Sequence, residues 1–320
     1  MIHKLRGRSL RELRDRLAQL GFAAAERRGL MSGRTLPPDL VPGLLTPWAA
    51  IDHGAVRREL PEPQRNAVIA SADRLIDGTF DILGLRALSF GTPVNWQLDP
   101  LSGRSAPMLH WSRVPFLDFD QVGDHKVTWE LNRHQWLITL GQAWVLTGDE
   151  QYAATTVRLL REWLVANPPK LGINWCSSLE LAFRVQSWIH GLRLFDGAAV
   201  LSDALRRDLV ASAAQQIDHV ARNLSTWFSP NTHLTGEALA LLSAGCAWPE
   251  LPRAARWRQI GWKILCDELP KQLRPDGVYF EQRAWYQAYT LDFYLLALTW
   301  ARHADLTIPD GMRGHVSAAA

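Results

Sequence analysis

From residue 124 almost to its end, the chain is a succession of helical segments separated by short turns. The clearest segment is 126–146, where large side chains recur every three or four residues: Trp129, Arg133, Trp136, Leu140 and Trp144. This spacing places all of them on one face of a helix. The same pattern predicts helices over 150–165, 177–194, 202–224, 252–273 and 284–304, and another that Asn231 opens.

Short turns between long helices constrain the fold, because they make neighbouring helices antiparallel. Examples are Thr147-Gly148-Asp149, Asn167-Pro168-Pro169 and Pro275-Asp276-Gly277. No repeat has a fixed residue period, which argues against a regular solenoid. Hairpins arranged around a common axis form an α/α toroid. We therefore expect an all-α fold, an incomplete α/α toroid of antiparallel helical hairpins.

The first third of the chain differs from this helical part. Residues 9–28 predict one basic helix with an apolar stripe of Leu10, Leu13, Leu17 and Leu20. Residues 31–63 are rich in Pro and Gly and predict an irregular connecting arm. A helix is expected over 66–76, and an irregular stretch with a small hairpin over 80–120. The predicted division is an N-terminal helix and arm, 1–63, and a toroid domain, 64–320.

Composition excludes several classes of protein. Hydrophobic residues make up 47% of the 320, as in a globular protein with a core. The net charge of +3 owes much to six basic residues within the first twenty, which predicts a solvated helix face and no nucleic-acid partner. No window of about 18 apolar residues predicts a membrane span. Three widely spaced cysteines predict neither a metal site nor a disulfide framework, and no cofactor is expected.

Tryptophan is unusually frequent, with 15 residues against 5 tyrosines. Indoles fill the space between large helices, and their flat faces also suit the stacking of sugar rings. Composition cannot divide these two uses. We expect Trp129, Trp175 and Trp285 to contact a substrate.

Residues 229–237 predict a helix start that suits an anion. Ser229 is expected to be the N-cap and Pro230 the first helical residue, which places Asn231 and His233 in the first turn. Free backbone N–H groups and the helix dipole attract negative charge there. The alternative is local: Asn231 caps the helix and His233 makes a nearby hydrogen bond, since capping chemistry is common.

A second cluster lies at 281–289. One apolar stripe explains Tyr289 as part of the core: Trp285, Tyr289, Phe293, Leu296 and Trp300. Tyr286 lies beside this stripe, near the helix start, where its hydroxyl can face a cavity. A Tyr acts as a base only if cations or hydrogen bonds stabilise the phenolate, and Arg283 is one candidate. The alternative is an interfacial Tyr with its hydroxyl in water.

Arg133 is a charge within an apolar stripe, so we expect it to be buried and paired with a carboxylate. Glu130, Glu180 and Glu237 are candidate partners, although Glu180 can also pair with Arg184 four residues later. Such an ion pair can serve structure or contact a substrate. The carboxylates also leave open a glycoside hydrolase pair. Phosphate-loop, metal and Gly-x-Ser-x-Gly motifs are absent from the sequence.

Several segments resemble, in order, the N-terminal helical domain of the heparinase II/III family. They are KLRGRS at 4–9, DHKVTWELNR at 124–133, LTGDE at 146–150, WLVANP at 163–168, NTHLTGE at 231–237 and DGVYFEQRAWY at 276–286. The resemblance covers nearly the whole chain, and its motifs are specific for the family but not for a substrate.

The resemblance implies a polysaccharide lyase that cleaves uronic-acid polymers, such as heparan sulfate or alginate, by β-elimination. In the family, an Asn helped by a neighbouring His neutralises the sugar carboxylate, and these match Asn231 and His233. A Tyr that protonates the leaving oxygen, and that can also take the first proton, matches Tyr286. Arg283 and Glu237 are expected to contact the substrate. The family's toroid is followed by a β-sandwich domain with a further catalytic His.

Two departures qualify these expectations. Tyr286 is followed by Gln287 where many members have His, and the chain stops at Ala320, before any β-sandwich. The resemblance therefore leaves open whether the chain is active alone, and a non-catalytic sugar-binding toroid and a toroid hydrolase remain alternatives. No secretory signal is recognised; the family's habit indicates the periplasm, and a native N-terminus would indicate the cytoplasm.

Overall fold

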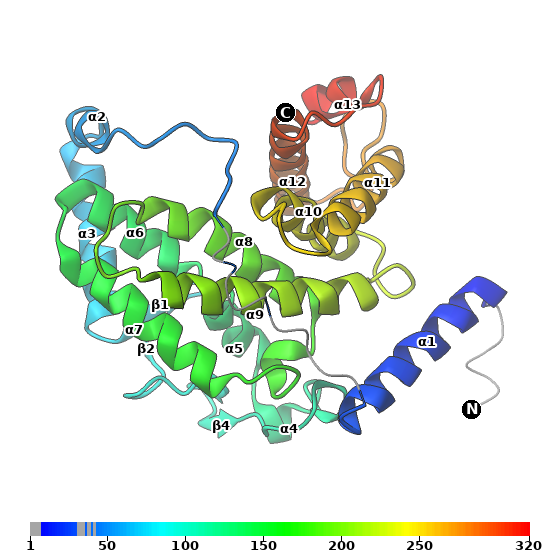
Figure 1. The fold of residues 1–320 in the computed structure, drawn as a ribbon, viewed down its shortest axis with the longest axis horizontal. Helices are drawn as coiled ribbons and strands as arrows, with labels where there is room; N and C mark the ends of the chain where they lie inside the picture. Colours follow the sequence, from blue (N-terminus) through cyan, green and yellow to red (C-terminus); the bar gives the residue numbers. More distant parts are fainter. Residues whose placement is uncertain (1–7, 31–35, 37–39, 41–42) are drawn as a thin grey trace.

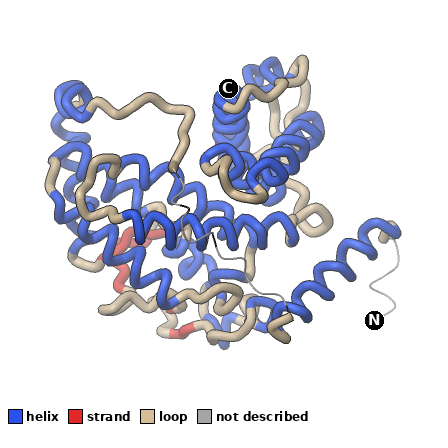
Figure 2. The backbone as a smooth tube through the Cα atoms, in the orientation of Figure 1, coloured by secondary structure: helices blue, strands red, loops and turns tan. Residues whose placement is uncertain are grey.

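The computed structural model describes residues 8–30, 36, 40 and 43–320, and helices dominate this part of the chain (Figures 1 and 2). The long helices are α1 (Leu10–Arg27), α3 (Glu62–Ile76), α6 (Trp136–Thr147), α7 (Glu150–Ala166), α8 (Ser178–Leu194), α9 (Asp203–Arg222), α10 (Thr232–Ala247), α11 (Ala254–Gln272) and α12 (Ala284–His303). The short ones are α2 (His53–Glu59), α4 (Phe119–Val122), α5 (His125–Asn132) and α13 (Met312–Ala319), with 3-10 turns η2 (Trp111–Arg113) and η3 (Ile173–Trp175). The predicted all-α class is confirmed.

The long helices form two layers, as an incomplete α/α toroid requires. In the inner layer α6 packs against α8, α8 against α10, and α10 against α12. The returning helices α7, α9 and α11 form the outer layer, with α9 in contact with both of the others. Figure 1 shows α10, α11 and α12 gathered at the C-terminal side, while α3, α6 and α7 lie at the other. The predicted helical hairpins are confirmed.

Helix α10 is the most enclosed element. All of its residues except His233 are buried. Two glycines allow the close packing of α10 against α11: a Cβ on Gly245 would lie 2.5 Å from the carbonyl oxygen of Ala254, and one on Gly261 would clash with that of Ala238. This tight hairpin fixes the position of the α10 N-terminus, which carries the predicted site.

The helix predicted over 126–146 is wrong in one respect, because it is interrupted. It divides into α5 and α6 at His134, whose φ of 59° lies in the left-handed region. That conformation is costly for a residue other than glycine. A buried hydrogen bond from the indole N–H of Trp188 to Nδ1 of His134, 2.9 Å long, stabilises it. Local periodicity carries no information about this tertiary contact.

The N-terminal region departs more from prediction. Ser9 caps α1 by accepting the N–H of Glu12, but Leu10, Leu17 and Leu20 are 68–87% exposed, so the predicted stripe is not part of the core. Helix α2 lies inside the stretch predicted to be an irregular arm. Helix α3 begins at Glu62, just before the predicted domain boundary. Ten of the 33 residues of that arm, and the basic residues before position 8, fall outside the described residues.

Strands are confined to the irregular stretch. β1 (Thr79–Ile82) pairs with β2 (Leu85–Ser89), and β3 (Leu98–Asp99) pairs with β4 (Arg104–Ser105), in two antiparallel two-stranded sheets. The predicted hairpin is confirmed, and a second accompanies it. Within the described ranges, none of the helices combines the length and the apolar character needed to cross a bilayer.

Candidate active site

The first turn of α10 begins two residues later than predicted. Asn231, not Ser229, is the N-cap, and its side-chain oxygen accepts the backbone N–H of His233 at 3.1 Å. The prediction of Ser229 as cap and Pro230 as first helical residue is therefore wrong. An Asn cap competes well because its short side chain reaches the second residue of the helix. This hydrogen bonding matches the alternative given above, in which Asn231 caps the helix and His233 makes a nearby hydrogen bond.

The hydrogen bonds around Asn231 determine the tautomer of His233. The Asn231 oxygen lies 3.0 Å from Nδ1 of His233, while its side-chain nitrogen donates to the carboxylate of Glu281 at 3.0 Å. Because this oxygen can only accept, Nδ1 of His233 carries the proton and Nε2 holds a lone pair. Burial lowers the pKa of His233, opposed by the charges of Glu180 and Glu281, so the ring is neutral at pH 7.

A second network lies within electrostatic reach of His233. Arg133 donates from Nε and Nη2 to both carboxylate oxygens of Glu180, at 2.7 and 3.0 Å, and pairs with Glu130 at 2.7 Å. Its guanidinium lies 4.6 Å from the ring centre of Phe183. The Arg133 side chain is 22% exposed. The predicted pairing of Arg133 with a carboxylate is confirmed, and Glu180 pairs with Arg133 rather than with Arg184.

The two tyrosines at the start of α12 have different surroundings. Tyr286 is half-buried, with its ring centre 6.4 Å from that of Tyr279. Tyr289 is also half-buried and packs against Phe293, with ring centres 4.6 Å apart. Burial raises the pKa of Tyr289, and the charge of Arg133 opposes that rise. Tyr289 therefore packs among aromatic side chains, as predicted, but the charge of Arg133 also affects its pKa.

The structure brings together only some of the predicted site residues. Asn231 and His233 are in direct contact, and α12, which carries Tyr286, packs against α10. The charges of Arg133 and Glu180 affect the pKa of both His233 and Tyr289. The contact by which Glu281 orients Asn231 was not predicted from the sequence. Its only sequence signal was its position five residues before Tyr286.

Two predicted substrate contacts lie in the interior. Glu237 is 1% exposed, and its two carboxylate oxygens accept from the backbone N–H and the hydroxyl of Ser225, at 2.7 and 2.6 Å. Burial raises the pKa of Glu237 to about 8. Trp175 is 1% exposed as well. Glu237 thus holds the loop that precedes α10 in place. Neither Glu237 nor Trp175 can contact a polymer, because both side chains are buried, so the two predicted substrate contacts are wrong.

The other predicted contacts are reachable to different degrees. Trp285 is 80% exposed, and Arg283 is an exposed residue at the start of α12. Trp129 is half-buried and donates its indole N–H to the carbonyl of Ile173 at 3.0 Å. Six tryptophans are almost fully enclosed: Trp96, Trp163, Trp175, Trp188, Trp248 and Trp300. The indoles therefore largely build the core, and of the three tryptophans expected to contact a substrate only Trp285 is largely exposed.

The described residues contain no group of three or more His, Cys, Asp or Glu side chains placed to hold a metal ion. The groups that the candidate site offers are an amide donor, a neutral imidazole, a tyrosine hydroxyl and a guanidinium held by carboxylates. An amide donor can stabilise an oxyanion, and a tyrosine can carry a proton. This set of groups suits proton abstraction next to a carboxylate.

Comparison with known proteins agrees with this arrangement. The family model "Heparinase II/III N-terminus" matches residues 62–312. A heparin-sulfate lyase of Pedobacter heparinus is 30% identical over 230 residues, which are 70% of this chain and 31% of the relative. A heparin-sulfate lyase of Bacteroides thetaiotaomicron is 28% identical over 201 residues, 62% of this chain and 28% of the relative. The chain thus spans about a third of the length of these relatives.

Solved structures show the same fold. The crystal structure of heparan sulfate lyase HepC from Pedobacter heparinus superposes with a TM-score of 0.64 at 24% identity, covering 94% of this chain and 42% of that one. The crystal structure of a heparinase III gives a TM-score of 0.65 at 20% identity, with the same two coverages. At this level of identity the likeness establishes the toroid fold alone.

Proposed function

Since this chain belongs to the heparinase II/III family, we propose that it is the toroid part of a polysaccharide lyase that cleaves uronic-acid polymers by β-elimination. One observation carries the proposal. Asn231, in the sequence motif that the family uses for its neutralising residue, has its side-chain amide fixed on both sides, by His233 and by Glu281. A preorganised donor of this kind stabilises a developing oxyanion.

In the proposed reaction, Asn231 donates to the carboxylate of the uronic acid. This donation lowers the energy of the enolate-like intermediate that forms when the proton on the adjacent carbon leaves. Tyr286 takes up this proton and then delivers it to the departing glycosidic oxygen, so the elimination consumes and releases no net proton. Glu281 occupies one N–H of the Asn231 amide and leaves the second for the substrate.

The geometry refines the role of His233. Its Nδ1 proton is committed to Asn231, and its Nε2 is an acceptor, so neutral His233 cannot also donate to the substrate carboxylate. We assign to His233 the orientation of Asn231 and an acceptor that faces the substrate. We further propose that activity uses a part of the enzyme beyond this toroid, because the curated relatives are about three times as long as the matched region.

Heparan sulfate is the preferred substrate in this proposal, because the two curated relatives are heparin-sulfate lyases. The test is to incubate the toroid, joined to the further part that this proposal requires, with heparan sulfate and with alginate, and to follow both ultraviolet absorbance and new reducing ends. Elimination creates a conjugated double bond, so the two signals should rise together. Reducing ends without absorbance would instead establish a hydrolase, and polymer binding with neither signal would establish the non-catalytic alternative.

A further inference from the structure

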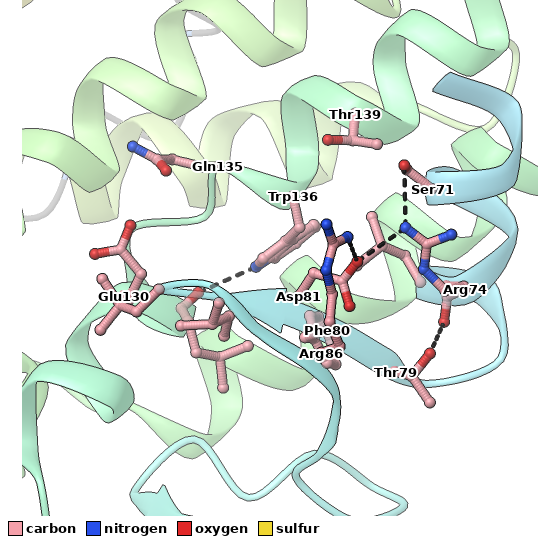
Figure 3. Close-up of a pocket in the computed structure, with 14 residues that line it drawn as sticks. Ser71, Arg74, Thr79, Phe80, Asp81, Arg86, Glu130, Gln135, Trp136 and Thr139 are labelled. Atoms are coloured by element: carbon pink, nitrogen blue, oxygen red, sulfur yellow. Dashed lines mark hydrogen bonds and ion pairs between the residues drawn. The ribbon is translucent and has the colours of Figure 1, made fainter. Parts of the chain in front are cut away.

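A polar cavity of roughly 430 Å³ opens between the first β-hairpin and the α5–α6 corner (Figure 3). Its walls come from α3, β1, β2, the end of α5 and the start of α6. No binding role was predicted for this region. The hairpin lies in the stretch expected to be irregular, and the other walls lie in the helices expected over 66–76 and 126–146. The cavity is distinct from the α10–α12 site, and neither Asn231 nor Tyr286 lines it.

The cavity has an apolar floor and a polar rim. The floor consists of side chains that are at most 7% exposed: Leu75, Phe80, Ile82, Leu131 and Trp136. On the rim, the side chains of Gln135 and Thr139 make no hydrogen bond with other cavity residues in Figure 3. A sugar ring has the same two-sided character, with C–H groups on its faces and hydroxyls around its edge. The rim therefore offers unused hydrogen-bonding groups where a saccharide would need them.

One end of the cavity carries a fixed positive charge. Asp81 accepts from Arg74 and from Arg86, each at 2.9 Å, and from the backbone N–H of Ala87 at 2.9 Å. These bonds, led by that from Ala87, lower the pKa of Asp81 to about 2 despite some burial. Two arginines against one carboxylate leave a net charge of +1. The Arg86 side chain is 79% exposed, so its remaining N–H groups are open to an anion.

The other end of the cavity adjoins the Arg133 network. Glu130 lines the cavity and also pairs with Arg133 at 2.7 Å. Arg133 in turn binds Glu180, and His233 lies within electrostatic reach of both. A polymer bound at the α10–α12 site and extended past Arg133 would therefore meet this cavity.

We propose that the cavity is a subsite for a flanking saccharide unit of the same acidic polymer, with an anionic group of that unit contacted by Arg86. This inference rests on the proposed function, since it takes its ligand class from it. The ring lies on the apolar floor with its hydroxyls toward Gln135 and Thr139. The anionic group is a carboxylate or a sulfate, which are alike in geometry and charge toward a guanidinium.

The experiment is a calorimetric titration of the chain with three hexasaccharides: sulfated heparan, the same backbone without sulfate, and an uncharged glucan. The variant is Arg86→Gln. Its matched control is Arg104→Gln, because Arg104 is also an exposed hairpin arginine that faces an aspartate, Asp120, but lies outside the cavity. We expect Arg86→Gln to weaken binding of the sulfated hexasaccharide by about two- to fivefold, as for one exposed ionic contact, and Arg104→Gln to leave it unchanged.

The three ligands identify the anionic group. A loss confined to the sulfated hexasaccharide assigns Arg86 to sulfate, and an equal loss with the unsulfated one assigns it to carboxylate. A second variant, Thr139→Val, should weaken both acidic ligands without changing charge. Equal affinities of Arg86→Gln and Arg104→Gln would overturn the subsite, as would equally tight binding of the glucan or no binding of any hexasaccharide by the unchanged chain.

Activity separates this inference from the proposed function. If the unchanged chain forms the unsaturated product but Arg86→Gln keeps full affinity, the subsite is refuted and the lyase assignment stands. If Arg86→Gln loses affinity while the toroid joined to its further part yields no unsaturated product from any polymer, the lyase assignment fails and the subsite stands.

Discussion

Two arginines, Arg184 on α8 and Arg133 at the C-terminal end of α5, have opposite kinds of partner. Arg184 is fully buried and donates to the carbonyl oxygens of Asn132 and Asn174 and to the side chain of Gln216. Its guanidinium stacks 4.6 Å from the ring centre of Trp163. Arg133 is partly exposed and is held by two carboxylates. The first arginine ties neutral backbone groups together, and the second keeps two negative charges beside an open site.

The difference shows that the residues around Arg184 stabilise the fold, whereas those around Arg133 retain groups that can contact a ligand. Around Arg184 each guanidinium nitrogen is bonded within the protein, so nothing remains for a ligand. Around Arg133 the neighbouring groups keep free capacity, including Nε2 of His233, which belongs to the only residue of α10 that is not buried. Substitutions in the two regions should therefore change different quantities, stability in the first and turnover in the second.

The largest expected effect is on stability, from Arg184→Met. The substitution leaves the carbonyls of Asn132 and Asn174 without donors in a dry interior. We expect the free energy of unfolding to fall by about 3–5 kcal/mol, because each buried acceptor left without a donor costs roughly 1–3 kcal/mol. Urea denaturation measures it, with Arg158→Met as an exposed control. Loss of less than 1 kcal/mol would remove the contrast between the two arginines.

The largest effect on turnover is expected from Tyr286→Phe, which removes the transferable proton while it keeps the ring. In the active enzyme, turnover should fall by a factor of at least about 100–1,000. Tyr289→Phe is the matched control and should leave turnover nearly unchanged, because Tyr289 packs against Phe293. Because the charge of Arg133 also affects the pKa of Tyr289, comparing the two variants tests which tyrosine transfers the proton. Loss of product with Tyr289→Phe instead would transfer the proton role to that residue.

A comparable loss of turnover should follow Asn231→Ala, at a small cost in stability. Removal of one oxyanion donor lowers turnover by a factor of about 100–1,000. Loss of the helix cap lowers the free energy of unfolding by only about 1 kcal/mol. Steady-state kinetics and thermal denaturation of the same sample measure both. A large loss of stability with unchanged turnover would show that Asn231 serves the structure and not the reaction.

Arg133→Met should combine the two kinds of effect. It leaves Glu130 and Glu180 as unpaired, partly buried charges, so we expect roughly 3 kcal/mol less stability. Adding Glu180→Gln to this variant should restore part of that loss, because one of the two charges is then removed. An unchanged denaturation midpoint in Arg133→Met would show that the ion pairs contribute nothing to stability.

The last prediction concerns the pH dependence of stability and Glu237, a buried carboxylate beside which the described residues place no cation. Its pKa is raised to about 8, so between the ordinary value near 4.5 and about 8 the unfolded chain releases a proton that the folded chain keeps. This carboxyl therefore makes stability fall as pH rises, by at most about 1.4 kcal/mol per pH unit. Glu237→Gln keeps the Ser225 contacts and should flatten the profile between pH 5 and 8. Parallel profiles for the two proteins would contradict the raised pKa.

The sequence by itself determined most of the helices and one part of the site. Apolar periodicity and turn residues located the ends of the long helices after position 124 to within about two residues, because those signals are local. They missed the break at His134 and the short helix α13. The motif around Asn231 and His233 and the aromatic stripe of α12 were also visible in the chain. The need of Arg133 for a carboxylate partner followed from its place among tryptophans.

Only the tertiary structure decided which groups meet. The break at His134 depends on Trp188, which lies 54 residues later, and the choice of Glu180 as partner of Arg133 joins two different helices. The contact of Glu281 with Asn231, the burial of Glu237 and Trp175, and the cavity beside Arg86 all come from segments far apart in sequence. Hydrogen bonds and burial at such separations depend on packing, and periodicity along one helix carries no record of its neighbours.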